Sequence, residues 1–384
     1  METVMSFSPS PLTSQLHIFS PHKIRRNKGK SPLGSCRVGP RMSLDQPPSP
    51  SSSSNPGTTL LKNVTKLLWG PSLPPGLLIS TVRTAWNSTW QLMMSQLAPS
   101  DSSGNYTRPA SKFSLQKNPP ATTNLHLYYR LGRRAKTVPW EFKAIRGRGT
   151  DILVPGVDNA NGCKNLKEVY KLRVGGYTGR ATVPMLWDVD KKDVACNESY
   201  DIIQIFNSGL NEKSRNPSLD LAPGELKGKI EEWNKLIYPN VNNGVYRCGF
   251  AQSQEAYDRA VNDVFNTLET INDHLGGSRY LCGETLTLAD VCLFTTLIRF
   301  DVVYNVLFKC TKKKLIEYPN LHGYMRDIYQ MPKVAATCNF MEIMDGYYKI
   351  LFPLNPGGIR PAMPSGCEHQ LLSRPHNRGI PVIS

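Results

Sequence analysis

Five segments with a helical apolar pattern fill the second half of the chain, and they constrain the fold more than any other feature. Apolar residues recur there with the 3.6-residue period of an amphipathic helix. The segments are residues 226–237, 254–275, 288–307, 315–329 and 334–347. Thr287 and Asp290 stand in a capping-box arrangement just before the third apolar run. The pattern predicts an all-helical domain over residues 213–350.

A different pattern precedes these helices. The runs LHLYY (125–129), VPMLW (183–187) and VACN (194–197) read as short strands, and the last two are separated by the turn DVDKKD. Residues 198–206 then show helical spacing. A strand–turn–strand–helix unit forms the second half of a thioredoxin-like βαβαββα domain. The fold class is therefore α/β plus all-α, with the thioredoxin-like domain over residues 121–212 and the helical domain after it.

The first 45 residues have the composition of a targeting segment. Residues 3–44 contain no Asp or Glu, many Ser, and a basic cluster that includes Lys23, Arg25 and Arg26. An acid-poor, Ser-rich and basic segment is typical of an organelle transit peptide, and the absence of an apolar core disfavours a secretory signal. We expect a transit peptide over residues 1–45 and a chloroplast location, with mitochondrion or cytoplasm as alternatives.

Charge is unevenly distributed along the chain. The net charge of +16 lies entirely in the first 150 residues, because residues 151–384 hold 26 basic and 26 acidic side chains. A basic surface can indicate nucleic-acid binding, but no nucleic-acid-binding motif occurs and the main body is neutral. We therefore expect no nucleic-acid partner.

The cysteines and the apolar runs exclude further classes of protein. Nine cysteines are scattered without a C-x-x-C pair, a pattern that predicts neither a zinc site nor a disulfide framework. No apolar run approaches the ~20 residues of a membrane helix. We predict reduced thiols, no metal and no membrane insertion.

Two less regular regions complete the organisation. Residues 46–120 form a Pro/Ser linker and an N-terminal extension, whose tryptophans Trp69, Trp86 and Trp90 are expected to pack on the main body. Residues 351–384 contain six prolines, and we expect an extended tail there.

Several of these segments resemble one protein family, the glutathionyl-hydroquinone reductases, which are xi-class, omega-like glutathione transferases. The resemblance rests on TVPMLWD (182–188), CNESYDIIQIFN (196–207), NNGVYRCGFAQSQEAYD (242–258) and YLCGETLTLADVCLFTTLIRFDVVY (280–304). The run GPSLPPGLLISTVRTAWNSTWQLMMSQLAPS (70–100) resembles the extension of plant chloroplast members. The resemblance implies glutathione-dependent reduction of glutathionyl-hydroquinones and a homodimer.

The resemblance implies a glutathione site. Pro184 matches a cis-proline, with the Val183 backbone free to pair with the cysteinyl part of glutathione as an added strand. Ser199 starts a helix whose N–H groups can bind a carboxylate, and Glu198 can hold the ligand's ammonium group. Trp140 matches a tryptophan that covers glutathione. Each also has a structural reading, as a helix cap or a buried core residue.

The second substrate implied by the resemblance is an aromatic hydroquinone. Tyr246, Tyr304 and Tyr347 match tyrosines of its pocket, where a phenol can hydrogen-bond a ring oxygen or donate a proton. The alternative is that they are core tyrosines with satisfied hydroxyl groups.

The chain departs from the family pattern at the nucleophile. The family reaction uses the thiolate of a Cys-Pro-Trp-Ala motif, which forms a mixed disulfide with glutathione. Here no cysteine occurs between Cys36 and Cys163, and only ten residues separate Tyr129 from Trp140. A parallel crossover needs a dozen or more residues, so the first helix and second strand of the domain do not fit.

No catalytic residue is therefore assigned. Three alternatives stay open: a reductase or transferase, an inactive glutathione- or quinone-binding protein, and a truncated splice or gene-model product.

Overall fold

The computed structural model describes residues 2–6, 75–114, 125–130, 145–146, 153–154, 158, 160–209 and 216–378. Contacts divide the chain into two compact units. One contains Met1–Ser8 and Ser88–Ser384, and the other is Pro9–Asn87. Of the second unit, the structure describes the first half of helix α2 (Pro75–Leu97). Trp69 and Trp140 lie outside the described residues.

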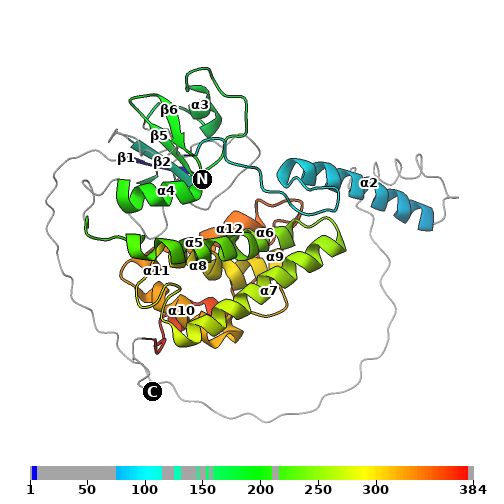
Figure 1. Ribbon diagram of the computed structural model, residues 1–384. Helices are drawn as coiled ribbons and strands as arrows, with labels where there is room; N and C mark the ends of the chain where they lie inside the picture. The colour runs from blue at the N-terminus through cyan, green and yellow to red at the C-terminus, as the bar shows by residue number, and fades with distance from the viewer. Residues whose placement is uncertain are drawn as a thin grey trace, which may run out of the picture. The chain divides into compact units, whose positions relative to one another are not determined.

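A four-stranded sheet with the order β1-β2-β5-β6 forms the first part of the larger unit (Figure 1). Its strands are β1 (Glu2–Ser6), β2 (Leu125–Arg130), β5 (Met185–Asp188) and β6 (Asp193–Cys196), and every neighbouring pair is antiparallel. Strands β2, β5 and β6 confirm the three predicted strands. Strand β1 was not predicted, and it lies in the segment that we expected to be a transit peptide. A separate pair joins β3 (Ile145–Arg146) to β4 (Leu153–Val154).

Within the described part of the chain, each face of the sheet carries one helix. Helix α3 (Leu166–Lys171) packs with Tyr128 and Trp187 on one face. Helix α4 (Ser199–Gln204), which continues into the π-helical turn η1 (Ile205–Gly209), packs with Leu186 and Cys196 on the other. This alternation follows from the two-residue period of a strand, which points successive side chains of β5 to opposite faces. The arrangement confirms the thioredoxin-like assignment.

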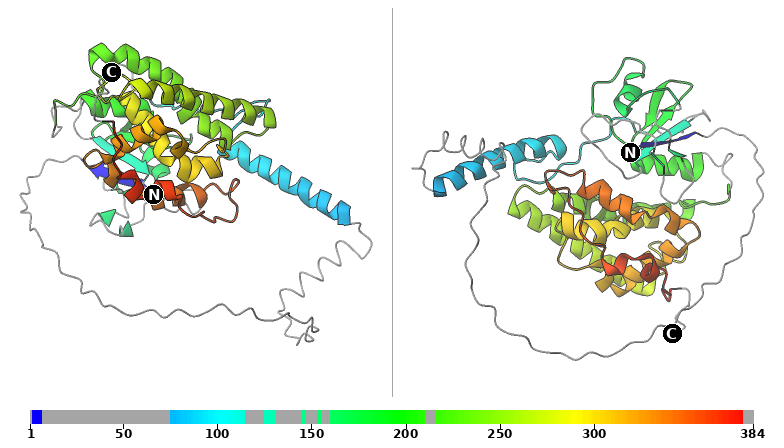
Figure 2. Two further views of the ribbon diagram at one scale, coloured as in Figure 1. Left: turned by 90° about the horizontal axis from the view of Figure 1, so that it is seen from below. Right: turned by 180° about the vertical axis from the view of Figure 1, so that it is seen from behind.

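The helical region, residues 216–378, surrounds one continuous apolar core (Figure 2). The five predicted helical segments are all present. Their bounds are α5 (Lys227–Ile237), α7 (Gln254–Gly277), α8 (Leu288–Arg299), η5 (Phe300–Tyr304), α9 (Asn305–Leu307), η6 (Leu315–Glu317), α10 (Pro319–Gln330), α11 (Val334–Thr337) and α12 (Phe340–Tyr348). Further short elements are η3 (Gly224–Leu226), η4 (Tyr238–Asn242) and α6 (Gly244–Gly249).

The predicted capping box starts α8. The Thr287 N–H group donates to Asp290 Oδ2 at 2.8 Å, and the reciprocal bond of the box is also present. Asp290 is fully buried, and its Oδ1 accepts from the Leu281 N–H group and from the Tyr324 hydroxyl group, both at 2.9 Å. The cap thus ties α8 to α10 and to the loop before it.

Two expectations about the chain ends are corrected. Trp86 is 47% exposed rather than packed, because it lies one turn before the part of α2 that reaches the core. Trp90 is packed, and its indole N–H donates to the Pro353 carbonyl oxygen at 3.2 Å. The tail is not wholly extended, since η7 (Ser365–Cys367) and α13 (His369–Leu372) bury Cys367 and Leu372.

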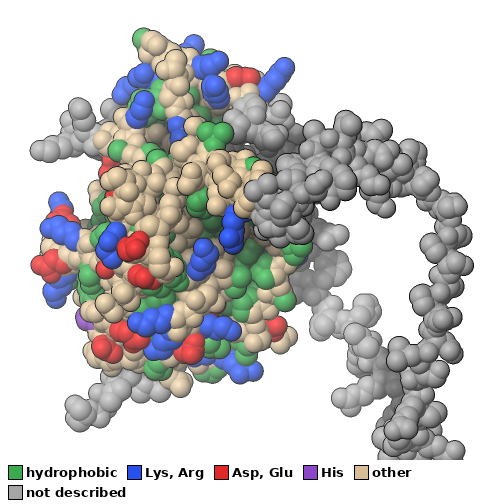
Figure 3. Space-filling view, turned by 90° about the vertical axis from the view of Figure 1, so that its right-hand side faces the viewer, with side chains coloured by type: hydrophobic (Ala, Val, Ile, Leu, Met, Phe, Trp, Pro, Cys, Tyr) green, Lys and Arg blue, Asp and Glu red, His purple; other side chains and the backbone are tan. Residues whose placement is uncertain are grey.

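The surface carries charges of both signs. Acidic and basic side chains are interspersed over the lower part of the face in Figure 3, as the zero net charge of residues 151–384 requires. No helix among the described residues has the length and apolar character needed to cross a bilayer.

Candidate functional site

A cavity of about 1080 Å³ is lined by residues next to the ends of β5 and β6, by α4, by Arg108 and by the helical region. It contains the residues that the sequence analysis assigned to two different ligands. Val183, Pro184, Glu198 and Ser199 line it from the sheet side, and Tyr246, Tyr304 and Tyr347 line it from the helical side. The structure therefore brings together seven of the eight predicted site residues. Trp140, the eighth, lies outside the described residues.

The sheet side of the cavity begins at the bend before β5. The Val183–Pro184 peptide bond is cis, as predicted. The next part of this wall is the start of α4, where Glu198 is the N-cap residue and Ser199 is the first helical residue. Glu198 makes no side-chain cap hydrogen bond, so its carboxylate does not bind the N–H groups of its own helix.

A segment of the N-terminal extension holds Glu198 in place. The Ser111 hydroxyl group donates to Glu198 Oε2 at 2.7 Å. The neighbouring Asn197 exchanges backbone and side-chain bonds with Phe113: Asn197 N donates to the Phe113 carbonyl oxygen at 2.8 Å, and Phe113 N donates to Asn197 Oδ1 at 3.0 Å. The extension therefore fixes the position of the carboxylate at the cavity wall.

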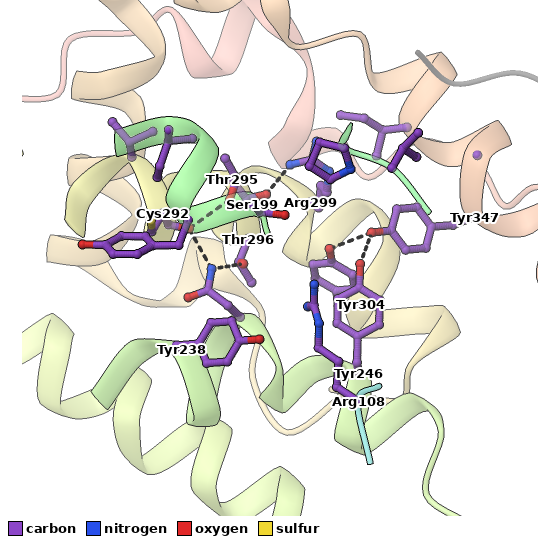
Figure 4. Close-up of a pocket in the computed structure, with 18 of the residues that line it drawn as sticks. Arg108, Ser199, Tyr238, Tyr246, Cys292, Thr295, Thr296, Arg299, Tyr304 and Tyr347 are labelled. Carbon is purple, nitrogen blue, oxygen red and sulfur yellow. Dashed lines mark hydrogen bonds between the residues drawn. The ribbon is translucent and has the colours of Figure 1, made fainter. Parts of the chain in front are cut away.

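Three tyrosine hydroxyl groups converge on the helical side (Figure 4). Tyr347 Oη lies 2.6 Å from Tyr246 Oη and 2.9 Å from Tyr304 Oη. Burial raises the pKa of Tyr246 and of Tyr304 well above the usual tyrosine value, and Tyr347 raises both further. Both phenols stay protonated at neutral pH. Two bonds among three hydroxyl groups leave at least one proton free to be donated to a ligand.

Local structure places these tyrosines. Tyr304 ends the π-helical turn η5, Tyr246 lies in α6 and Tyr347 in α12. Phe308 packs beneath all three rings, with centroid distances of 5.2–5.9 Å. A Cβ atom on Gly249 would lie 2.4 Å from the Phe308 ring, so only glycine fits there. A second π-helical turn, η4, supplies Tyr238 and Asn242 to the cavity. Such turns are frequent at functional sites.

The sequence analysis missed several lining residues, among them Arg108, Cys292 and Arg299. Arg299 could have been found from the sequence, because it lies in the family run LIRFDVVY five residues before Tyr304. Arg108 could not, since it stands in a polar loop. Cys292 is the one cysteine among the described residues that lines the cavity. Burial raises the pKa of its thiol to about 11, so it is a neutral thiol at pH 7. No cluster of three or more His, Cys, Asp or Glu side chains suited to a metal occurs in the described ranges.

Comparison with known proteins identifies the family. Residues 254–327 match the family model of the glutathione S-transferase C-terminal domain. The chain is 47% identical over 204 residues to glutathionyl-hydroquinone reductase YqjG of Escherichia coli, covering 53% of this chain and 61% of the relative. It is 40% identical over 215 residues to glutathionyl-hydroquinone reductase PcpF of Sphingobium chlorophenolicum, covering 56% of this chain and 68% of the relative. The chain belongs to the glutathionyl-hydroquinone reductase family.

Solved structures of this family agree with the fold. The glutathione-bound structure of E. coli YqjG superposes with a TM-score of 0.55 at 41% identity, covering 62% of this chain and 74% of that chain. The xi glutathione transferase of Phanerochaete chrysosporium superposes with a TM-score of 0.52 at 41% identity, covering 54% of this chain and 71% of that chain. The chain spans 61% and 68% of the length of the two curated relatives, and 74% and 71% of the two solved chains.

Proposed function

We propose that this chain binds glutathione and an aromatic hydroquinone, free or as a glutathionyl conjugate, in the single cavity described above. One observation carries the proposal: the residues predicted for the two ligands line the same space. A cavity of about 1080 Å³ lies at the upper end of the range for small-molecule sites, roughly 300–1,000 Å³. It can therefore hold a tripeptide and a substituted ring together.

The sheet side suits glutathione. Glu198 presents a carboxylate, held by Ser111, to the ammonium group of the γ-glutamyl residue. Ser199 and the N–H groups at the start of α4 suit the γ-glutamyl carboxylate. The Val183 backbone can pair with the extended cysteinyl segment. Trp140 remains a predicted cover for the ligand.

The helical side suits a hydroquinone. The three tyrosine hydroxyl groups can donate to and accept from a ring hydroxyl group. Phe250 lines the cavity next to Tyr246 and provides apolar contact for a ring.

We propose binding without the thiol–disulfide reaction of the family. That reaction requires a thiolate, which is formed by lowering a cysteine pKa near 8.5. The chain has no Cys-Pro-Trp-Ala motif, and Cys292 has its pKa raised rather than lowered. The alternative of a truncated splice or gene-model product is tested by sequencing the transcript across residues 125–145. A longer form with a Cys-Pro-Trp segment would replace the binding proposal with a reductase.

We further propose import into the chloroplast and a homodimer. The composition of residues 3–44 supports the first, and the family resemblance supports the second. Fusion of residues 1–45 to a fluorescent protein tests the location, and light scattering of the purified chain tests the assembly.

Glutathione affinity, measured by titration calorimetry, tests the sheet side. Glu198→Ala with Ser199→Ala should weaken binding at least about tenfold, because a charge-assisted hydrogen bond contributes roughly 1.5–3 kcal/mol. Glu225→Ala with Ser218→Ala changes the same residue types outside the cavity, and this control should bind normally. Equal affinities of the two double variants would contradict the assignment.

Hydroquinone affinity tests the helical side. Tyr347→Phe removes the hydroxyl group that joins the other two, and we expect a loss of about fivefold to tenfold, since a hydrogen bond contributes roughly 1–1.5 kcal/mol. Glutathione affinity should not change. Tyr257→Phe is the matched control, because its hydroxyl group donates to the Lys309 carbonyl oxygen outside the cavity. Hydroquinone release from a glutathionyl conjugate above the uncatalysed rate would overturn the inactive assignment.

A further inference from the structure

Two arginine side chains line the cavity beside the tyrosines. Arg299 is the last residue of α8 and is half-buried. Arg108 lies in the extension, between the bridge that pairs Ser100 with Tyr106 and the segment that contacts Glu198. Both side chains line the cavity that Tyr246, Tyr304 and Tyr347 also line, and Figure 4 shows Arg299 bonded back to Thr295 of its own helix. They reach the same ligand site from two different parts of the chain.

Neither guanidinium group has a carboxylate within ion-pair distance among the described residues. Arg299 Nη1 donates to the carbonyl oxygen of Thr295 in its own helix. Arg108 lies over the Tyr238 ring, 5.9 Å from its centroid. Each group therefore keeps most of its five N–H donors for another partner.

Carboxylates also line the cavity, and they could pair with the arginines. Glu198 accepts from Ser111 and belongs to the glutathione side. Asp201 and Glu342 line the cavity too, and both have contacts within the chain. Burial raises the pKa of Tyr246 and Tyr304, and the Arg299 guanidinium makes a smaller contribution that lowers both. Arg299 therefore lies within electrostatic reach of the phenol-binding end.

We infer that the phenolic ligand carries an anionic substituent, namely a carboxylate on the hydroquinone ring, which Arg299 and Arg108 bind. The inference rests on the proposed function, whose hydroquinone site it makes more specific. A planar guanidinium fork matches a carboxylate with two parallel hydrogen bonds, and such charge-assisted pairs are the stronger ones. The tyrosine hydroxyl groups hold a ring hydroxyl while the arginines hold the substituent, so a ring with both groups is fixed at two points.

Three probes isolate the substituent: 1,4-dihydroxybenzene, 2,5-dihydroxybenzamide and 2,5-dihydroxybenzoate. Calorimetric titration of the full chain at pH 7 and low salt should show the benzoate binding at least about tenfold more tightly than either neutral ring, or ~1.4 kcal/mol. The preference should fall as salt is added, because ions screen a partly exposed charge.

Variants identify the groups responsible. Arg299→Met and Arg108→Met should each reduce the preference for the benzoate, and Arg299→Lys should keep part of it. Arg108 is exposed, so its replacement tests the idea even if Arg299→Met does not fold, which circular dichroism will show. Lys112→Met is the matched control, because Lys112 is a cation on the same segment that does not line the cavity.

Two outcomes would overturn the inference and leave the proposed function standing. In the first, all three probes bind equally while glutathione binds normally. In the second, the arginine variants lose glutathione affinity but keep the benzoate preference, which would assign both guanidinium groups to the carboxylates of glutathione. Failure of glutathione and all three phenols to bind would overturn the proposed function together with this inference.

Discussion

The sheet region, residues 125–209, and the helical region both line the cavity, but they are held together differently. The helical region has one apolar cluster that runs from Met94 to Leu372. The sheet region has two small clusters, one on each face of the sheet. It also relies on polar bonds to the extension, at Asn197 and Glu198.

The difference has a consequence for binding. Free energies of local opening are lowest where few apolar side chains are buried. The tyrosine wall, supported by the large core, should be rigid before any ligand binds. The glutathione wall should open more readily, and its geometry should depend on a few side-chain bonds. Mutations that remove one polar group from each region can test this contrast.

The largest effect is expected in the helical region, at Asp290. Asp290→Ala leaves the Leu281 N–H group, the Thr287 N–H group and the Tyr324 hydroxyl group without their buried acceptor. Each buried unsatisfied group costs roughly 1–3 kcal/mol, so we expect a loss of about 3–5 kcal/mol in the free energy of unfolding. Urea unfolding followed by circular dichroism measures it. Asp258→Ala, in an exposed turn of α7, is the control. If Asp290→Ala lowers the free energy of unfolding by less than about 1 kcal/mol, the three buried bonds of Asp290 do not stabilise the fold as expected.

A smaller and more local effect is expected in the sheet region. Asn197→Ala removes the acceptor of the Phe113 N–H group and the donor to Tyr170 Oη and Thr182 Oγ1. We expect a loss of about 1–3 kcal/mol, weaker glutathione binding and unchanged hydroquinone binding. Amide hydrogen exchange should become faster only around Ser111 and Glu198, and not in the helical region. Asn266→Ala, exposed on α7, should change neither affinity, and equal losses for both ligands at Asn197 would contradict the contrast between the walls.

The smallest effect concerns pH and α12. Burial acts to raise the pKa of Asp345, but hydrogen bonds and charges from Lys349 and Arg360 outweigh it, so the pKa is lowered in the folded state. A carboxyl group with a lowered folded pKa stabilises the fold above its unfolded value, about 3.9. That stabilisation is lost as pH falls through the lower, folded value. Urea midpoints between pH 6 and pH 2 should fall less in Asp345→Asn than in the unaltered chain. If the urea midpoints of the two proteins fall equally with pH, the ion pairs of Asp345 do not stabilise the fold.

The sequence predicted regular elements better than irregular ones. The long helices were predictable because burial on one face imposes a 3.6-residue pattern. Helix α6 was missed, since six residues between Gly244 and Gly249 are too few to show a period. The π-helical turns at Tyr238 and Phe300 were missed for a related reason: they shift the register of a helix without changing its composition. Strand β1 gave no apolar alternation long enough to predict.

The cavity was predictable only where a motif carried the information. The three tyrosines came from the resemblance, and their hydroxyl contacts could not be derived from positions about 40 to 100 residues apart. Arg108 lines the cavity and Ser111 bonds Glu198 at its wall, because the extension passes beside it. That position depends on the pairs formed by Asn197 with Phe113 and by Tyr106 with Phe250, which no local pattern specifies.

The hydrogen bond between Trp90 and Pro353 joins two residues that the ribosome makes at very different times. These two residues are 263 positions apart, and a ribosome adds roughly 5–20 residues each second. The end of α2 therefore emerges about 13–50 s before the carbonyl group that receives its indole proton. During that interval the Trp90 indole lacks the Pro353 carbonyl group. The packing of α2 is therefore completed only when the C-terminal part of the chain has been made.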